Sequence, residues 1–158
     1  MVPKQQSASQ RAIHWALKTV TAGRMRSYMT AYQTTIGETV YVSADWDERA
    51  ADDRYITMRH ERVHLRQFDI YGVPVMAVLY LLVPMPMGLA WFRAHFEREA
   101  YEETIRAAAD VYGIDHVFDE SYRDAIIDQF TGPSYGWMWP FRASLETWYA
   151  RVLEEVAA

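Results

Sequence analysis

The sequence of 158 residues contains no cysteine. This absence excludes a disulfide framework and any metal site built on thiolates. The chain also lacks a basic excess, since its formal net charge is −5, and no basic stretch is interleaved with aromatic residues. We therefore expect no nucleic-acid partner. Internal repeats and low-complexity linkers are absent as well, which predicts a single domain over residues 1–158.

Charged residues are missing from the whole stretch Ile70–Phe92. A run of this length is a candidate membrane span. Pro84 and Pro86 interrupt its second half, however, and proline breaks the hydrogen-bond ladder of a helix. We therefore predict a buried helix followed by a tight corner, with membrane contact through this stretch as the alternative. The N-terminus lacks the apolar core of a secretory signal, which predicts a cytoplasmic protein, with peripheral membrane association as the corresponding alternative.

An H-E-x-x-H motif, His60-Glu61-Arg62-Val63-His64, lies in a stretch that predicts a helix from Asp52 to Asp69. Positions i and i+4 share one face of a helix, so His60 and His64 point two imidazoles at the same place. Glu61 lies about 100° around the helix, where it reaches a metal-bound water without being a ligand. The motif therefore predicts a Zn²⁺ site in which Glu61 is the base.

A solvated, charged helix that carries two histidines by coincidence is the alternative interpretation. The hydrophobic spacing speaks against it, because the histidines fall on the face that should be buried. That inward face comprises Ile56, His60, Val63, His64 and Gln67. The charged residues, Glu61 among them, mostly lie on other faces. Two buried imidazoles need partners for their ring nitrogens, and a shared metal ion supplies one partner for both.

A catalytic zinc ion needs three protein ligands and one open position for water. A second helical pattern, from about Leu89 to Asp110, places Glu97 on its inward face and Glu99 on the opposite, charged face. Glu97 is therefore the predicted third ligand, and Glu99 is the alternative. The inward face of this helix comprises Arg93, Glu97, Ala100, Tyr101, Thr104 and Ala108.

An H-E-x-x-H motif followed by a glutamate on a downstream helix resembles the zincin metallopeptidases of the gluzincin type. Such families often carry a small residue three positions after the ligand glutamate, and Ala100 fits that place. The sequence departs from the pattern at Tyr101, where an aspartate usually bonds a ligand histidine; Tyr101 is left to accept that bond. The resemblance covers Thr34 to Glu103 and implies zinc-dependent hydrolysis of a peptide or protein substrate.

The elements around the two helices predict an α+β, mainly helical, zincin-like fold. Alternating residues in Arg26–Gln33 and Thr39–Ser43 predict a small antiparallel β-hairpin before the motif helix. By resemblance, Thr39–Ser43 is the edge strand to which an extended peptide adds. Three further helices are expected: from Ser7 or Ser9 to near Gly23, from Asp119 to Phe130, and after Pro140 with Phe141, Leu145, Trp148 and Val152 on one face.

These features together predict hydrolysis of a peptide bond by metal-activated water, with Glu61 as general base. The aromatic loop Thr131–Pro140 is expected to plug the core. Alternatively it walls the substrate pocket, and Tyr135 donates a hydrogen bond to the developing oxyanion, as in several gluzincins. Two other functions are consistent with the sequence: a membrane-apposed binding or scaffolding module without catalysis, and a vestigial enzyme or one restricted to a single partner protein.

Overall fold

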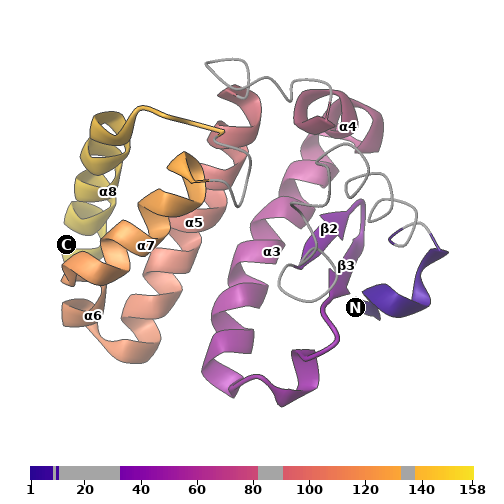
Figure 1. Cartoon of the computed structure of the whole chain (residues 1–158), viewed down its shortest axis with the longest axis horizontal. Coiled ribbons are helices and arrows are strands. Elements are labelled where there is room, and N and C mark those ends of the chain that lie inside the picture. The colour runs from indigo at the N-terminus through magenta and orange to yellow at the C-terminus, as the bar shows by residue number, and fades with distance from the viewer. Residues whose placement is uncertain (9, 11–32, 82–90, 133–137) are drawn as a thin grey trace.

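Two long helices, α3 (Ala51–Tyr71) and α5 (Trp91–Tyr112), lie against each other at the centre of the fold. The computed structural model describes the chain except residues 9, 11–32, 82–90 and 133–137. A small sheet packs on α3, and three shorter helices lie on the other side of the pair, next to α5 (Figure 1). The described architecture is thus mainly helical with a small sheet, as the predicted α+β class requires.

The sheet has its strands in the order β1 (Val2–Pro3), β3 (Thr39–Val42), β2 (Thr34–Ile36). β1 runs parallel to β3, and β2 runs antiparallel to it. β3 is therefore the central strand of the described sheet, and the prediction that it forms an open edge for a peptide is wrong. β1 escaped prediction because a strand of two residues is too short for hydrophobic alternation to show.

The hairpin formed by β2 and β3 confirms the prediction, with a shift in its first strand. Ile36 lies opposite Thr39, so Gly37 and Glu38 alone form the turn. Gly37 has a φ of 57°, the left-handed conformation that two-residue hairpin turns require. The residues predicted as the loop therefore contribute most of β2. Of the predicted first strand, residues 26–32 lie outside the described part of the chain, and Gln33 is not in a strand.

The motif helix α3 agrees with its predicted extent to within two residues. It begins at Ala51, so Asp52 and Asp53 lie inside its first turn, where negative charge is favourable. It ends before Gly72, whose φ is 74°. Its buried face includes Glu61 beside three predicted inward positions, Val63, His64 and Gln67. The expectation that Glu61 lies off the buried face is wrong, because β2 covers that side of the helix.

α4 (Val73–Leu81) follows directly after Gly72. Among the side chains of α4 that the structure describes, Met76 is buried as predicted, whereas Val73, Val75 and Val78 are exposed, so the prediction of a buried helix is wrong for these three. The helix lies at the end of the molecule where α3 ends and α5 begins (Figure 1). Within the described residues, no helix combines the length and the hydropathy that crossing a membrane requires.

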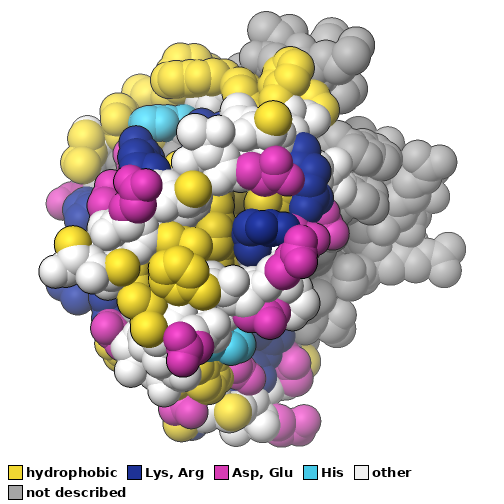
Figure 2. Space-filling model, turned by 90° about the vertical axis from the view of Figure 1, so that its left-hand side faces the viewer, with side chains coloured by type: hydrophobic (Ala, Val, Ile, Leu, Met, Phe, Trp, Pro, Cys, Tyr) yellow, Lys and Arg dark blue, Asp and Glu magenta, His cyan; other side chains and the backbone are white. Residues whose placement is uncertain are grey.

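The larger hydrophobic core lies between α5 and three C-terminal helices: α6 (Ile114–Phe118), α7 (Glu120–Thr131) and α8 (Arg142–Ala157). All four helices contribute, with side chains such as Ile105, Val117, Phe130 and Leu145, none of which has measurable exposure. On the outer face of these helices, acidic and basic side chains are interspersed (Figure 2). These helices therefore anchor one side of α5, which leaves its other side for α3.

The C-terminal helices mostly follow the sequence prediction. α7 begins after Asp119, whose carboxylate accepts hydrogen bonds from two backbone N–H groups of the first turn. α8 buries the predicted residues Leu145, Trp148 and Val152. Phe141 is wrong as an inward residue: it is 55% exposed, because α8 begins only at Arg142 and Phe141 precedes its first turn. The predicted first helix, to near Gly23, lies mostly outside the described residues.

Candidate metal centre

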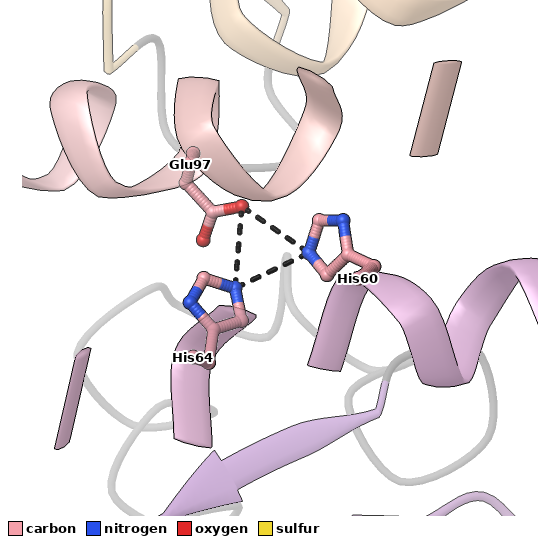
Figure 3. Close-up of side chains that lie close together, drawn as sticks. All are labelled: His60, His64 and Glu97. Atoms are coloured by element: carbon pink, nitrogen blue, oxygen red, sulfur yellow. Dashed lines mark hydrogen bonds and ion pairs between the residues drawn. The ribbon is translucent and has the colours of Figure 1, made fainter. Parts of the chain in front are cut away.

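Three predicted side chains meet between α3 and α5. His60 Nε2 and His64 Nε2, one helical turn apart on α3, are 3.2 Å from each other. Glu97 reaches them from α5, with its Oε2 atom 3.7 Å from His60 Nε2 and 3.8 Å from His64 Nε2 (Figure 3). Glu97 is 2% exposed. The structure thus brings together the three residues that the sequence singled out as metal ligands.

The outer nitrogen of each imidazole has a partner that fixes its proton. The hydroxyl of Thr104 donates to the carbonyl of Ala100, so its oxygen accepts from His60 Nδ1–H. The side-chain nitrogen of Gln67 is used in two donated bonds, so its carbonyl oxygen accepts from His64 Nδ1–H. Where a ring is neutral, its proton therefore lies on Nδ1. Both Nε2 atoms then present lone pairs toward Glu97.

Thr104 and Gln67 accept the hydrogen bonds from the outer nitrogens of the ligand histidines, a role for which Tyr101 was predicted. The Tyr101 ring packs edge-on against the His60 ring, with centroids 4.9 Å apart, while Thr104 bonds the His60 Nδ1 atom. Both Thr104 and Gln67 had been placed on the inward faces of their helices. Their role as histidine partners was missed, because the expected pattern had a carboxylate after the small residue. Both are polar residues on the inward faces of their helices, close to the predicted ligands, and this position could have identified them as partners of the histidines.

Glu99 lies outside the group of three and supports it from behind. Its Oε2 atom accepts a hydrogen bond from Gln67 Nε2 at 2.8 Å, and its Oε1 atom is 3.4 Å from His95 Nε2. Gln67 Nε2 also donates to the backbone carbonyl of Phe96 on α5. Glu99 thus holds the amide that holds His64. Of the two glutamates weighed as third ligand, Glu97 is the one that faces the histidines.

Burial sets the charges of the centre. Burial lowers the pKa of His60 well below its ordinary value, and the nearby His64 acts in the same direction. Burial raises the pKa of Glu97 to about 7, which His64 partly opposes and the negative charge of Glu61 reinforces. The metal-free centre therefore favours a neutral His60 and a Glu97 that ionises only near neutral pH. A cation between these groups would reverse the effect of burial on Glu97.

Glu61 lies beside the centre and faces the sheet. Its side chain is buried, and its Oε2 atom accepts a hydrogen bond of 2.6 Å from the hydroxyl of Thr35 on β2. Lys4, just after β1, is also buried and lies near enough for the charge of Glu61 to raise its pKa. Neither Thr35 nor Lys4 was predicted as a site residue from the sequence. The sequence held no local signal for either, because each reaches Glu61 only through the pairing of the sheet.

The three ligand atoms have the spacing of a tetrahedral metal site. Bonds of about 2.0–2.1 Å at tetrahedral angles put ligand atoms roughly 3.3–3.5 Å apart. The distances of 3.2, 3.7 and 3.8 Å among the three atoms bracket that value. Two neutral imidazoles and a carboxylate also form a donor set that zinc accepts. The described residues therefore fit a divalent metal ion, and the group could hold one.

Tyr135, the predicted oxyanion donor, lies in residues 133–137, outside the described part of the chain. Comparisons with protein-family models, with curated proteins and with solved structures find no match for this chain. The geometry of the centre therefore carries the functional proposal, together with the resemblance of the motif.

Proposed function

We propose that this chain is a zinc-dependent metallopeptidase of the gluzincin type. One observation carries the proposal: two imidazole lone pairs and a carboxylate oxygen converge in a buried place, within 4.8 Å of one another. When their protons are removed, three electron-pair donors in a buried place favour a cation between them. The hydrogen bonds of Thr104 and Gln67 hold the two histidines in this arrangement. The chain thus holds three side chains in a geometry that a bound divalent ion would stabilise.

The residues around the ion divide the chemistry between them. Bound zinc supplies a polarised water and stabilises negative charge on the carbonyl oxygen. His60, His64 and Glu97 supply three ligands, which leaves a fourth position for that water. Glu61 would act as the general base, accepting a proton from the attacking water and returning it to the leaving amine. Because Glu61 directly follows His60 and its charge acts on Glu97, its carboxylate lies close to the reacting atoms.

Metal analysis of protein purified without added metal tests the centre first. We expect close to one equivalent of zinc per chain, and a large loss of zinc affinity in Glu97→Ala. Glu99→Ala should have a smaller effect, because Glu99 acts only through Gln67. A protein that holds no transition metal and takes up none on titration with zinc would contradict the proposal.

Glu61→Gln separates catalysis from metal binding. We expect this variant to keep its equivalent of zinc and to lose peptide hydrolysis by about 10³-fold or more, since general-base catalysis contributes on the order of 10²–10⁴. Glu154→Gln, the same change at an exposed position of α8, is the control and should leave turnover unchanged. Cleavage of a fluorogenic peptide library reports both. Hydrolysis that survives in Glu61→Gln would remove Glu61 as the base.

A second function, contact with a lipid surface, is favoured by one specific observation. Seven apolar side chains from the charge-free stretch are exposed where α3, α4 and α5 meet: Ile70, Tyr71, Val73, Val75, Val78, Trp91 and Phe92. Tryptophan and tyrosine are enriched at membrane interfaces, and the stretch lacks charges that would resist shallow burial. We propose that this surface docks on lipid, which is compatible with catalysis or with a binding role alone.

Vesicles of phosphatidylcholine with phosphatidylglycerol test this second function by co-sedimentation. We expect Trp91→Glu to reduce the sedimented fraction, because it places a charge in the apolar surface. Phe118→Glu, at a similarly exposed apolar position on α6, is the matched control and should sediment like the wild type. Equal sedimentation of both variants, or none of the wild type, would contradict lipid contact.

A further inference from the structure

The buried carboxylate of Glu61 accepts a hydrogen bond from one outer strand of the sheet and lies within the electrostatic reach of a buried lysine from the other outer segment. Thr35 comes from β2, and Lys4 follows β1. Both side chains are buried: Lys4 has no exposed area, and Thr35 and Glu61 are 8% and 5% exposed. Three polar groups from three distant parts of the sequence thus share one water-poor place beside the metal ligands.

Thr35 occupies one oxygen of this carboxylate and not the other. Its hydroxyl donates to Oε2 of Glu61 over 2.6 Å, the short distance typical of a bond to a charged acceptor. The Oε1 atom takes part in no hydrogen bond among the described residues. A base that exchanges a proton with water needs one oxygen available and the carboxylate plane fixed, because a displacement of about 1 Å is enough to lower a rate roughly 10²-fold. The bond from Thr35 supplies that fixation.

The ammonium group of Lys4 provides a positive charge near the carboxylate of Glu61. A buried carboxylate is unfavourable unless an opposite charge or hydrogen bonds compensate it. Burial lowers the pKa of Lys4 to about 8, and the negative charge of Glu61 acts in the opposite direction, toward the ammonium form. The negative charge of Glu61 therefore favours the ammonium form of Lys4.

We propose that Thr35 and Lys4 are positioning residues for Glu61: the hydroxyl fixes Oε2, the ammonium compensates the charge, and Oε1 is left to exchange the proton with water. This inference rests on the proposed function of Glu61 as base. It gives the small sheet a part in the reaction, since β1 and β2 deliver the two groups while β3 joins them.

Substitutions at Thr35 test the hydroxyl separately from its size. Thr35→Val removes the hydroxyl at nearly constant volume and should lower kcat about 10- to 100-fold with KM and zinc content unchanged. Thr35→Ser keeps the hydroxyl and should restore most of the lost kcat. Thr39→Val makes the same change on β3, away from Glu61, and should behave like the wild type. Lys4→Met should lower kcat about 10-fold, with Gln5→Met at the neighbouring exposed residue as its control.

A double-mutant cycle in the metal-free protein measures how much the hydrogen bond between Thr35 and Glu61 contributes to stability, independently of catalysis. Thr35→Val, Glu61→Met and the double variant are compared by their urea midpoints. We expect the double variant to shift the midpoint by less than the sum of the two single shifts, because the first substitution already removes the bond. Additive shifts, or equal kcat in Thr35→Val and Thr35→Ser, would overturn the positioning role. If the zinc-loaded wild type hydrolyses no peptide, the proposed function is contradicted. The double-mutant cycle would still decide whether Thr35 holds Glu61.

Discussion

The two faces of α5 pack against regions of opposite character. One face places Ala94 and Ile105 in the apolar core with α6, α7 and α8, where burial of apolar surface contributes about 25 cal/mol per Å². The other face turns Glu97 and Thr104 toward the histidines of α3, where burial disfavours charge and lone pairs face one another. The first region stabilises the fold, and the second is held in place by it. Stability and chemistry are thus separated across a single helix.

The largest effect is expected from removing a large side chain of the apolar core, which should lower stability without changing the metal centre. Phe130, which has no exposed area, packs between the rings of Tyr101 and Trp148. We expect Phe130→Ala to lower the free energy of unfolding by about 3–5 kcal/mol, since it removes buried surface and leaves a cavity. Urea unfolding measures the loss. Zinc per folded chain should stay the same; a parallel loss of zinc affinity in the folded protein would show that the two regions are not separable.

In the metal-free centre we expect the opposite effect: Glu97→Gln should stabilise the folded protein near neutral pH. Below about pH 4.5 Glu97 is protonated in both states; as the pH rises toward its folded pKa of about 7, only the unfolded chain releases the proton. Wild-type stability should therefore fall over this window relative to Glu97→Gln, by at most about 3 kcal/mol. Urea midpoints of both metal-free proteins at pH 5 and pH 7.5 measure the difference.

His60 titrates in the opposite sense, since burial lowers its pKa, but it does so in both proteins and largely cancels in the difference. A constant difference between wild type and Glu97→Gln at the two pH values would mean that Glu97 is already ionised in the metal-free protein. The carboxylate would then have to find compensation within the chain, and the contrast between the two faces of α5 would be weaker.

A smaller effect is expected from the amide behind His64. Gln67→Met keeps the volume and removes the acceptor of His64 Nδ1–H. We expect zinc affinity to fall about 10- to 100-fold, the usual effect of losing such a partner, which corresponds to about 1.4–2.8 kcal/mol. Gln129→Met on α7 is the matched control. Competition with a chelator measures the affinity, and equal affinities in the two variants would show that His64 needs no fixed partner.

The parts of the site that lie on helices could be predicted because helical spacing is local. The i, i+4 relation places His60 and His64 together whatever surrounds them, and the amphipathic pattern of α5 turns Glu97 rather than Glu99 inward. The two long helices, α7 and the inward face of α8 follow from the same periodicity. The mainly helical class was predictable for this reason.

The parts that could not be predicted depend on long-range packing. Thr35 and Lys4 reach Glu61 only because β1 and β2 flank β3, and a strand of two residues leaves no periodic signal. Glu61 was predicted to lie outside the buried face, because the sequence of α3 contains no sign of the strand β2 that covers it. The exposure of Val73, Val75 and Val78 on α4 likewise could not be predicted, because apolar composition alone suggested burial.

The sharing of α5 between two regions has a consequence for how a bound ion would leave. Two ligands belong to α3, which packs on a small sheet, and the third belongs to the helix anchored in the larger core. An ion bonded to both helices would act as a cross-link between the part of the chain that carries the small sheet and the part anchored in the larger core. Its release would then require only a local separation of α3 from α5, so the dissociation rate would follow sub-global opening, as amide hydrogen exchange of α3 would report, rather than global unfolding.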